Sequence, residues 1–267
     1  MSEINKPESE RLEPSSSALM SFSRPRLTLA SASPRRRELL AWLGATFQAI
    51  ATAGEEQNYA PPPTLVAALP ACPVPLVTHP TLLAWRKIIA ACADVPDGVI
   101  IGADTIVVLD DAVLGKPRDP DQARSMLRQL SGRTHTVYTG LAAIRQPAGK
   151  RSAVGDADLQ LLHAGALLDL VASDVRVDNL SDAEIADYVA TGEPMDKAGA
   201  YGIQGLGGRL VRSVAGSYTC VVGLPLVATH RLLVAAGYTQ LLEPADAYTR
   251  WLKAQGKEPL PCPPTFP

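Results

Sequence analysis

Short apolar segments and amphipathic segments alternate along the central part of the chain. The apolar ones are rich in aliphatic and β-branched residues, as in 98–109, which is typical of strands. The amphipathic ones repeat apolar residues at helical spacing. The segments predicted as strands are 26–30, 47–51, 98–109, 112–115, 134–144, 208–214 and 218–223, and those predicted as helices are 34–43, 82–92, 119–130, 181–192 and 225–237. This alternation predicts an α/β fold and leaves the strand order open.

Residues at the ends of two predicted helices support these boundaries. Ser33 is suited to cap a helix that begins at Pro34, and Gly44 is suited to end it. Ser181 and Glu184 have the spacing of a capping box, in which each side chain bonds the backbone amide of the other residue. We therefore expect a helix to begin at each of these places.

The two ends of the chain differ from its centre. Residues 1–24 are rich in Ser, Pro and Glu, and we expect a disordered tail because they offer too little apolar surface to offset the entropy of ordering. Residues 25–238 form the predicted domain. We expect the C-terminal extension, 239–267, to add little to the core, although Tyr248 and Trp251 leave its docking open.

Two interior stretches have the character of insertions. Residues 60–80 are rich in proline, which excludes a central strand or a continuous helix there. Residues 147–166 show no clear period.

Composition and charge narrow the class of protein. Of the 267 residues, 46% are hydrophobic and 19% are charged, a balance typical of a globular chain. The net charge of −2 gives no general footprint for nucleic acid or for a membrane surface. No apolar run approaches the roughly 18–20 residues of a membrane-spanning helix, and the N-terminus lacks the apolar core of a secretory signal. Four widely separated cysteines favour reduced thiols in the cytoplasm over a disulfide framework or a zinc site.

The first candidate for chemistry is the turn before the first predicted helix, Ser31-Ala-Ser-Pro-Arg-Arg. Such a turn presents unpaired backbone amides and the positive end of the helix dipole, which together suit an anion. Arg35 and Arg36 in the first helical turn oppose the dipole unless an anion neutralises them, and guanidinium groups suit phosphate oxygens. A basic helix face in contact with water is the alternative.

Asp104 is the second candidate, because a carboxylate inside an apolar strand is costly to bury unless it is paired, binds metal or lies at a cleft. Two interpretations of Asp104 are equally open: it is a metal ligand or general base, or it is an ordinary aspartate in a turn that accepts backbone hydrogen bonds. Lys87, Lys116 and Lys197 stand out because lysine is scarce in this chain, although each alone fits a solvent-exposed side chain. Lys116 follows the predicted hairpin after Asp104, which allows the two to be neighbours.

The stretch 197–208 contains closely spaced glycines, which let a backbone approach a ligand. Gln204 within it offers both a donor and an acceptor, a combination that can recognise the edge of a base. A loop that merely crosses the sheet is the alternative. The sequence contains no P-loop, no H-E-x-x-H and no G-x-S-x-G motif. With these classes of enzyme excluded, the candidate residues are a set of cations and a set of acids. The cations are Arg35, Arg36, Lys87, Lys116 and Lys197, and the acids are Glu55, Glu56 and Asp104. Such a combination fits a site that binds a polyphosphate and a divalent metal and activates a water molecule.

Several of these motifs occur together and in order. LASASPRRRELL, EEQ, IGADTIVVLDDAVLGKPRD, MLRQLSGRTHTVYTG, EPMDKAGAYGIQGLGG and GSYTCVVGLPL closely resemble the Maf family of nucleoside triphosphate pyrophosphatases, also called septum-formation-inhibitor-like proteins. The resemblance extends from Leu27 to Gly237. Within the family the chain resembles the branch acting on dTTP and UTP, because Asp104-Thr105 and the stretch 197–205 match that branch.

The resemblance implies a mixed, twisted sheet flanked by helices, with two lobes around a cleft, as in inosine triphosphatases. It implies Asp104 as the catalytic acid/base and Arg36, Thr105 and Gln204 as positions that set base selectivity. It implies that Arg35 lies beside the phosphates and that Glu56, Lys87 and Lys116 lie near the phosphates and a Mg²⁺ or Mn²⁺ ion. Glu55 is a weaker candidate for a metal ligand. We include Lys197 among the residues expected to bind the substrate. The implied partner is a pyrimidine nucleoside triphosphate, with no nucleic acid or membrane, and a homodimer is open. The alternatives are a non-catalytic nucleotide-binding regulator of cell division and the same reaction on another base.

Overall fold

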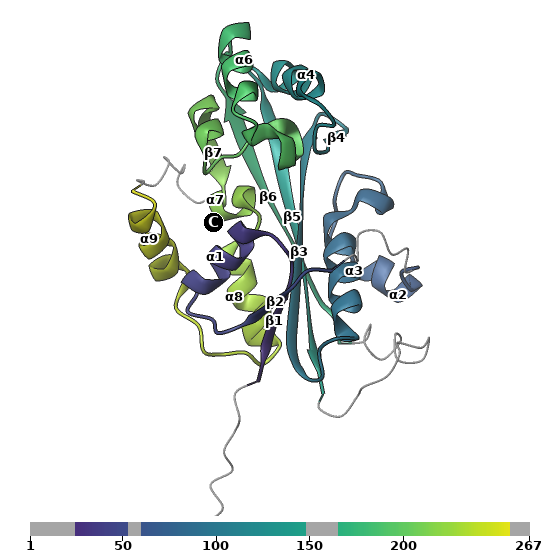
Figure 1. Ribbon diagram of the computed structural model, residues 1–267. Helices are drawn as coiled ribbons and strands as arrows, with labels where there is room; N and C mark the ends of the chain where they lie inside the picture. The colour runs from purple at the N-terminus through teal and green to yellow at the C-terminus, as the bar shows by residue number, and fades with distance from the viewer. Residues whose placement is uncertain (1–24, 53–59, 148–164, 257–267) are drawn as a thin grey trace, which may run out of the picture.

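A single seven-stranded mixed sheet forms the centre of the molecule (Figure 1). The computed structural model describes residues 25–52, 60–147 and 165–256. The strands are β1 (Leu27–Ala30), β2 (Gln48–Ile50), β3 (Gly98–Leu109), β4 (Ala112–Leu114), β5 (Thr134–Gln146), β6 (Leu167–Val177) and β7 (Val211–Gly216). Their order is β2-β1-β3-β5-β6-β7, and β4 pairs with β3. The β2-β1-β3 pairs are parallel and the other pairs are antiparallel.

Helices cover both faces of this sheet (Figure 1). They are α1 (Pro34–Trp42), α2 (Pro63–Ala68), α3 (Pro80–Cys92), α4 (Pro120–Leu130), α6 (Asp182–Ala190), α7 (Tyr218–Val222), α8 (Leu226–Ala235) and α9 (Pro244–Ala254). Short 3-10 turns are η1 (Leu76–Thr78), η2 (Glu193–Asp196), η3 (Ala198–Ala200) and η4 (Leu206–Leu210). α3 packs with α2 on one face, whereas α1, α7, α8 and α9 lie on the other.

Successive residues of β3 serve opposite faces of the sheet, as the pleat of a strand requires. Ile100 belongs to the core under α3, whereas Val99 and Ile101 belong to the larger core on the opposite face. The same alternation brings Asp104 to the α3 face and Thr105 to the face of α1 and α7. The strand thus divides its two central polar residues between two environments.

α3 lies unusually close to the sheet at β5. A Cβ atom on Gly140 would fall 2.1 Å from the backbone nitrogen of Thr81, so a side chain at this position is excluded. This glycine pairs with Asp104 across the antiparallel ladder. The close approach brings Lys87, further along α3, to the carboxylate of Asp104.

The fold class predicted from the sequence is confirmed, and so are the Ser33 cap and the Ser181–Glu184 capping box. The strand predicted at 218–223 is wrong, because these residues form α7, capped by the hydroxyl of Ser217. A helix was not expected there because four of the five residues of α7 are aromatic or β-branched, and such residues are typical of strands. β6 was not predicted, and it begins directly after the stretch that lacked a period.

The proline-rich stretch 60–80 contains the short elements α2 and η1 and the first residue of α3, and it forms neither a strand nor a continuous helix, as predicted. The C-terminal extension, in contrast, was expected to add little to the core, and this is wrong for residues up to 256. Trp251 in α9 is fully buried, and its indole donates to Glu38 on α1. Tyr248 stacks on the same ring. The domain boundary at 238 stays a prediction.

Two further observations concern the described residues alone. None of their helices has both the length and the apolar character needed to cross a lipid bilayer. Cys72, Cys92 and Cys220 are free thiols, and Cys262 lies outside the described residues.

Candidate active site

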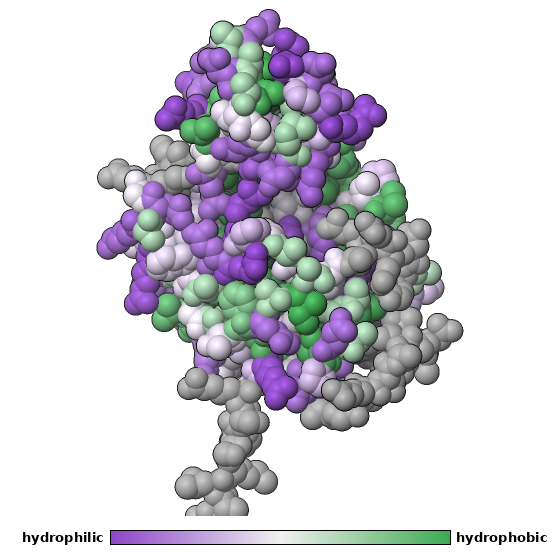
Figure 2. Space-filling view, viewed as in Figure 1, coloured by the Kyte–Doolittle hydropathy of each residue, from purple (hydrophilic) through white to green (hydrophobic). Residues whose placement is uncertain are grey.

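A cleft of about 540 Å³ opens where the edge of β3 is not covered by another strand. β1 pairs with β3 as far as Gly102, and β4 pairs with it from Val107 onward. Within the described residues, no strand pairs with this edge of β3 over 103–106. The turn before α1 and the segment after β4 border this gap. Hydrophilic residues gather on the surface between the tip of the molecule and its main body (Figure 2).

Eight of the ten residues singled out in the sequence line this one cleft, although they come from five separate stretches of chain. They are Arg35, Arg36, Lys87, Asp104, Thr105, Lys116, Lys197 and Gln204. The remaining two, Glu55 and Glu56, lie outside the described residues. Thr52, which lies shortly before them in the chain, lines the cleft. Asp104 therefore lies on the same side of the molecule as the Ser-Pro-Arg-Arg turn.

Asp104 and Lys87 form a nearly buried ion pair on the α3 side of the cleft. Lys87 Nζ lies 2.6 Å from Asp104 Oδ1 and donates a second hydrogen bond to the carbonyl of Ala103. Only 6% of the lysine side chain and 12% of the aspartate side chain are exposed. The ammonium group compensates the carboxylate, so that a charged group can be held at the cleft wall.

The opposite side of β3 carries a network around Arg36 and Thr105. The Arg36 guanidinium donates to the carbonyl of Gly223, to the Ser31 hydroxyl and, over 3.1 Å, to Thr105 Oγ1. Thr105 in turn lies 2.9 Å from the hydroxyl of Thr139 on β5. Two residues for which the family resemblance implied a common role in base selection therefore contact each other.

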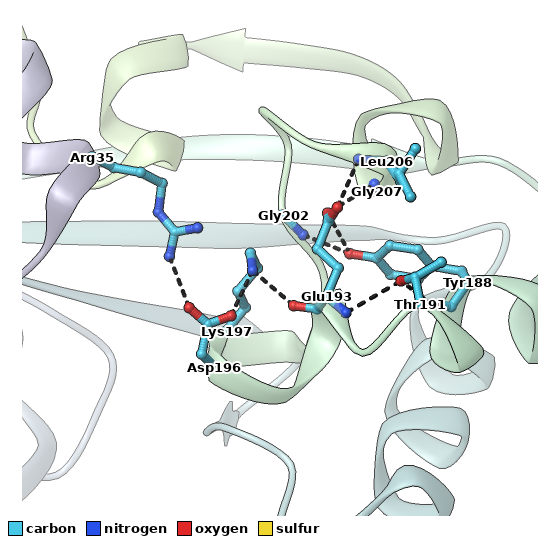
Figure 3. Close-up of polar contacts among 9 residues, drawn as sticks. All are labelled: Arg35, Tyr188, Thr191, Glu193, Asp196, Lys197, Gly202, Leu206 and Gly207. Atoms are coloured by element: carbon cyan, nitrogen blue, oxygen red, sulfur yellow. Dashed lines mark hydrogen bonds and ion pairs between the residues drawn. The ribbon is translucent and has the colours of Figure 1, made fainter.

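Residues 193–208, called the 193–208 segment below, form another wall of the cleft and include Lys197 and Gln204. Figure 3 shows the polar contacts that hold this segment. The carboxylate of Glu193 accepts hydrogen bonds from the amides of Leu206 and Gly207 and from the hydroxyl of Tyr188. The Tyr188 hydroxyl also accepts from the amide of Gly202. One carboxylate and one phenol thus hold the backbone on both sides of Gln204.

Glycine is required where this backbone passes the Glu193 carboxylate. A Cβ atom on Gly205 would lie 2.4 Å from Glu193 Oε2, within the contact distance of the two atoms. Glu193 is partly buried, which alone would raise its pKa. The amides of Leu206 and Gly207, the Tyr188 hydroxyl and the Lys197 ammonium outweigh burial and lower the pKa of this carboxyl. The carboxylate is therefore the stable form in which the segment is held.

Asp196 connects two cations from different parts of the cleft (Figure 3). Its Oδ1 accepts from Lys197 Nζ at 2.5 Å, and its Oδ2 lies 3.8 Å from Arg35 Nη2. Lys197 also donates to the carbonyl of Glu193. The Asp196 carboxylate thereby brings together an arginine of α1 and a lysine of the 193–208 segment. A phosphate group is negatively charged like this carboxylate, so the same two cations can interact with it.

The donor set fits a divalent cation held mainly by a substrate. Asp104 supplies a carboxylate at the cleft wall. Within the described residues, no group of three or more His, Cys, Asp or Glu side chains could hold a metal. Mg²⁺ is commonly bound by one or two carboxylates together with substrate phosphates. The Asp104 carboxylate, in a cleft whose cationic residues can bind phosphates, fits that mode of binding, whereas the Asp196 carboxylate is paired with Arg35 and Lys197.

Sequence reasoning missed three residues that organise this site. Glu193 and Asp196 precede Lys197 closely in the chain, so their position beside a selected lysine was the available signal. Thr139 lies in a segment predicted only as a strand, and nothing in its local sequence distinguished it. Its role follows from pairing with Thr105 across the β3–β5 ladder, which the sequence pattern does not reveal.

The fold and the cleft together define an α/β protein with a cleft rich in cationic residues at an uncovered edge of the sheet. A family model described as Maf-like protein matches residues 26–236. The dTTP/UTP pyrophosphatase of Escherichia coli O157:H7 is 46% identical over 224 residues, which cover 83% of this chain and 98% of that protein. The dTTP/UTP pyrophosphatase of Yersinia pestis bv. Antiqua (strain Antiqua) is 47% identical over 208 residues, 78% of this chain and 91% of that protein. The chain belongs to the Maf family, and the resemblance found in its motifs is confirmed.

Proposed function

We propose that this protein hydrolyses dTTP, UTP and related pyrimidine nucleoside triphosphates to the monophosphate and pyrophosphate. The observation that carries the proposal is the convergence of Asp104, five cationic residues and Gln204 on a single cleft. The names of the Escherichia coli and Yersinia pestis relatives supply the substrate class. The 98% coverage of the first relative supports transfer of the whole activity rather than of a part.

In the proposed reaction a water molecule attacks the α-phosphorus, and the bond from the bridging oxygen to that phosphorus breaks. Asp104 orients the water and accepts its proton. Pyrophosphate leaves with the electrons of the broken bond. Arg35, Lys87 and Lys116 stabilise the negative charge on the phosphates, which is the main contribution that proteins make to phosphoryl transfer.

The proposed cofactor is Mg²⁺ or Mn²⁺, held by Asp104, by the phosphates and, as predicted from the sequence, by Glu56 and Glu55. When bound, such an ion offsets phosphate charge and lowers the pKa of a coordinated water. Arg36, Thr105 and Gln204 are proposed to contact the base. Lys197 is proposed to contact the phosphates, since its ammonium group lies beside the carboxylate that also faces Arg35.

A regulator that binds nucleotides without hydrolysing them is the second candidate. The buried Asp104–Lys87 pair speaks against it, because holding a carboxylate at 12% exposure is costly and binding a polyanion gains nothing from it. A cytoplasmic location and a homodimer remain predictions from the sequence.

The test is pyrophosphate release with Mg²⁺ from a panel of dTTP, UTP, CTP, ATP and GTP. We expect dTTP and UTP to be the best substrates, and Asp104→Asn to lower kcat by about 100- to 10,000-fold, the range for loss of a general base. Circular dichroism verifies that the variant is folded. Preference for a purine contradicts the proposed substrates, and near-normal turnover by Asp104→Asn removes this residue from the proposed mechanism.

A further inference from the structure

We propose that Thr139, which lies behind the cleft wall, determines which bases Thr105 accepts by fixing the direction of its hydroxyl proton. Thr139 is a positioning residue in this proposal, because it acts through Thr105. The consequence is selection of bases that present a ring N–H group over bases that present a lone pair at the same place. The inference rests on the proposed function and assigns a physical origin to its choice of pyrimidine.

Four groups form a chain of hydrogen bonds behind the cleft. Arg36 Nη2 lies 3.1 Å from Thr105 Oγ1, which lies 2.9 Å from Thr139 Oγ1, which lies 2.8 Å from the carbonyl oxygen of Cys220. Thr105 and Thr139 face each other directly in the β3–β5 ladder. Thr139 is fully buried, while Thr105 lines the cleft.

The two ends of this chain fix the direction of every proton in it. A guanidinium group can only donate and a carbonyl oxygen can only accept. The amides of Gly223 and Leu224, which ordinarily could reach the Cys220 carbonyl from the end of α7, both donate to Thr219 instead. The Thr139 proton therefore satisfies the Cys220 carbonyl, and the bond between the two threonines uses the proton of Thr105.

Because its only hydroxyl proton is donated to Thr139, Thr105 has no proton to donate to a ligand. A hydroxyl has one proton and two acceptor positions. Thr105 gives its proton to Thr139 and accepts one hydrogen bond from Arg36, so a single acceptor position remains. Toward the cleft, Thr105 is an acceptor only.

An acceptor-only group distinguishes uracil and thymine from cytosine. Once N1 bears the sugar, uracil and thymine have one ring N–H, at N3, and this group can donate to Thr105. Cytosine bound in the same pose presents an N3 lone pair, so that two acceptors face each other. A mismatch of this kind leaves polar groups unpaired and typically changes a rate by about ten- to a hundredfold.

The first experiment removes the Thr139 hydroxyl with the nearly isosteric change Thr139→Val. The Thr105 hydroxyl is then free to rotate. It can turn its proton toward the cleft and donate to N3 of cytosine, or turn a lone pair toward the cleft and accept from N3–H of uracil. We expect the ratio of kcat/KM for UTP to that for CTP to fall at least about tenfold, mainly through improved use of CTP. Thr139→Ser keeps the hydroxyl and should keep the wild-type ratio.

A matched variant separates this effect from loss of stability. Thr81 is also fully buried, and its hydroxyl likewise donates to a backbone carbonyl, that of Asp169, on the opposite face of the sheet. Thr81→Val should lower the melting temperature comparably and leave the UTP-to-CTP ratio unchanged. An unchanged ratio in folded Thr139→Val overturns the proposal, and so does a wild-type protein that uses UTP and CTP equally.

The second experiment needs no variant and decides the matter if Thr139→Val does not fold. UTP methylated at N3 lacks the ring N–H, and we expect the wild-type protein to hydrolyse it at least about a hundredfold less efficiently than UTP. Equal rates for the two nucleotides overturn the inference. In that case the proposed function survives, because it fails only if the wild-type protein releases no pyrophosphate from UTP or dTTP.

Discussion

β3 and the 193–208 segment both supply residues to the cleft, but different interactions hold them in place. β3 is fixed by backbone pairing with β5 over almost its whole length, from Gly98 to Val108. The 193–208 segment contains only short 3-10 turns and is held by the side chains of Glu193 and Tyr188. It also contains Ala200 at a φ of +60°, a left-handed conformation that is unfavourable for a residue other than glycine.

The difference shows which changes each region tolerates. The position of Asp104 and Thr105 depends on strand register, which no single polar side chain determines. The position of Lys197 and Gln204 depends on a few hydrogen bonds, so one substitution in these bonds displaces several groups together. We therefore expect substitutions at β3 to change charge and chemistry in place, and substitutions in the 193–208 segment to change geometry.

The largest expected effect is on stability and tests whether β3 depends on the ion pair between its own Asp104 and Lys87 of α3. Lys87→Met leaves the Asp104 carboxylate buried without its partner, and breaking a buried pair typically costs about 3–5 kcal/mol in the free energy of unfolding. The double variant Lys87→Met/Asp104→Asn has no unpaired charge, so we expect it to recover at least half of that loss. Urea unfolding at neutral pH measures four proteins, which are the wild-type protein, Lys87→Met, Asp104→Asn and the double variant.

Recovery in the double variant would show that the strand keeps its register without the ion pair. Additive losses in the two single variants would contradict this, since they would mean that each side chain supports β3 independently. We expect Lys87→Met and the double variant to hydrolyse nucleotides poorly even where stability is recovered, because both lack the Lys87 ammonium group that we place at the phosphates.

The second prediction concerns a contact that joins the 193–208 segment to β5, the strand that pairs with β3. His135 on β5 is 2% exposed, and its Nε2 lies 2.7 Å from the hydroxyl of Tyr201 in the 193–208 segment. Burial lowers the pKa of His135 from 6.5 to about 4, although Asp174 opposes the shift. Between these two values the unfolded chain binds a proton that the folded protein does not bind, so stability falls as the pH decreases through this window.

At about 1.36 kcal/mol for each pH unit, we expect this histidine to cost the folded protein about 2–3 kcal/mol between pH 7.5 and pH 4.5. Urea unfolding at both pH values measures the loss in the wild-type protein and in His135→Gln, which keeps a polar partner for Tyr201. The variant should lose less stability over the same interval by about this amount. Equal losses in the two proteins would exclude His135 as the cause.

Sequence reasoning predicted β3 better than it predicted the 193–208 segment, for a physical reason. Strand character and the unusual position of Asp104 are properties of consecutive residues, so both could be recognised locally. The hydrogen bonds that the amides of Leu206 and Gly207 donate to Glu193 connect residues more than ten positions apart, and no periodic pattern along the chain marks them. The glycines of the segment indicated close approach, but they did not indicate to what.

The same distinction explains the errors elsewhere. Residues 218–223 have strand propensity, yet the Ser217 cap and the packing of α7 against β5 and β6 determine a helix. Trp251 is buried because α9 meets α1 across more than two hundred residues of chain. Tertiary contacts of this kind outweigh local preference and are absent from the pattern along the chain.

The smallest expected effect is on substrate use and tests whether one carboxylate holds the 193–208 segment. Glu193→Gln replaces one acceptor oxygen by an NH₂ group, which then faces an amide or hydroxyl donor in place of an acceptor. We expect KM for UTP to rise about tenfold with a smaller change in kcat, since Asp104 and Lys87 stay in place. Loss of a hydrogen bond to a charged group, about 1.5–3 kcal/mol, is sufficient for a change of this size.

The matched control is Glu184→Gln, because Glu184 also accepts from a backbone amide and a hydroxyl, in the capping box of α6, and does not line the cleft. This variant should leave KM unchanged. Hydrogen exchange provides the direct measurement: in Glu193→Gln the amides of Gly202, Leu206 and Gly207 should exchange faster, whereas those of β3 should not. Faster exchange in both regions would mean that the strand and the segment are one cooperative unit, and the contrast between them would then be wrong.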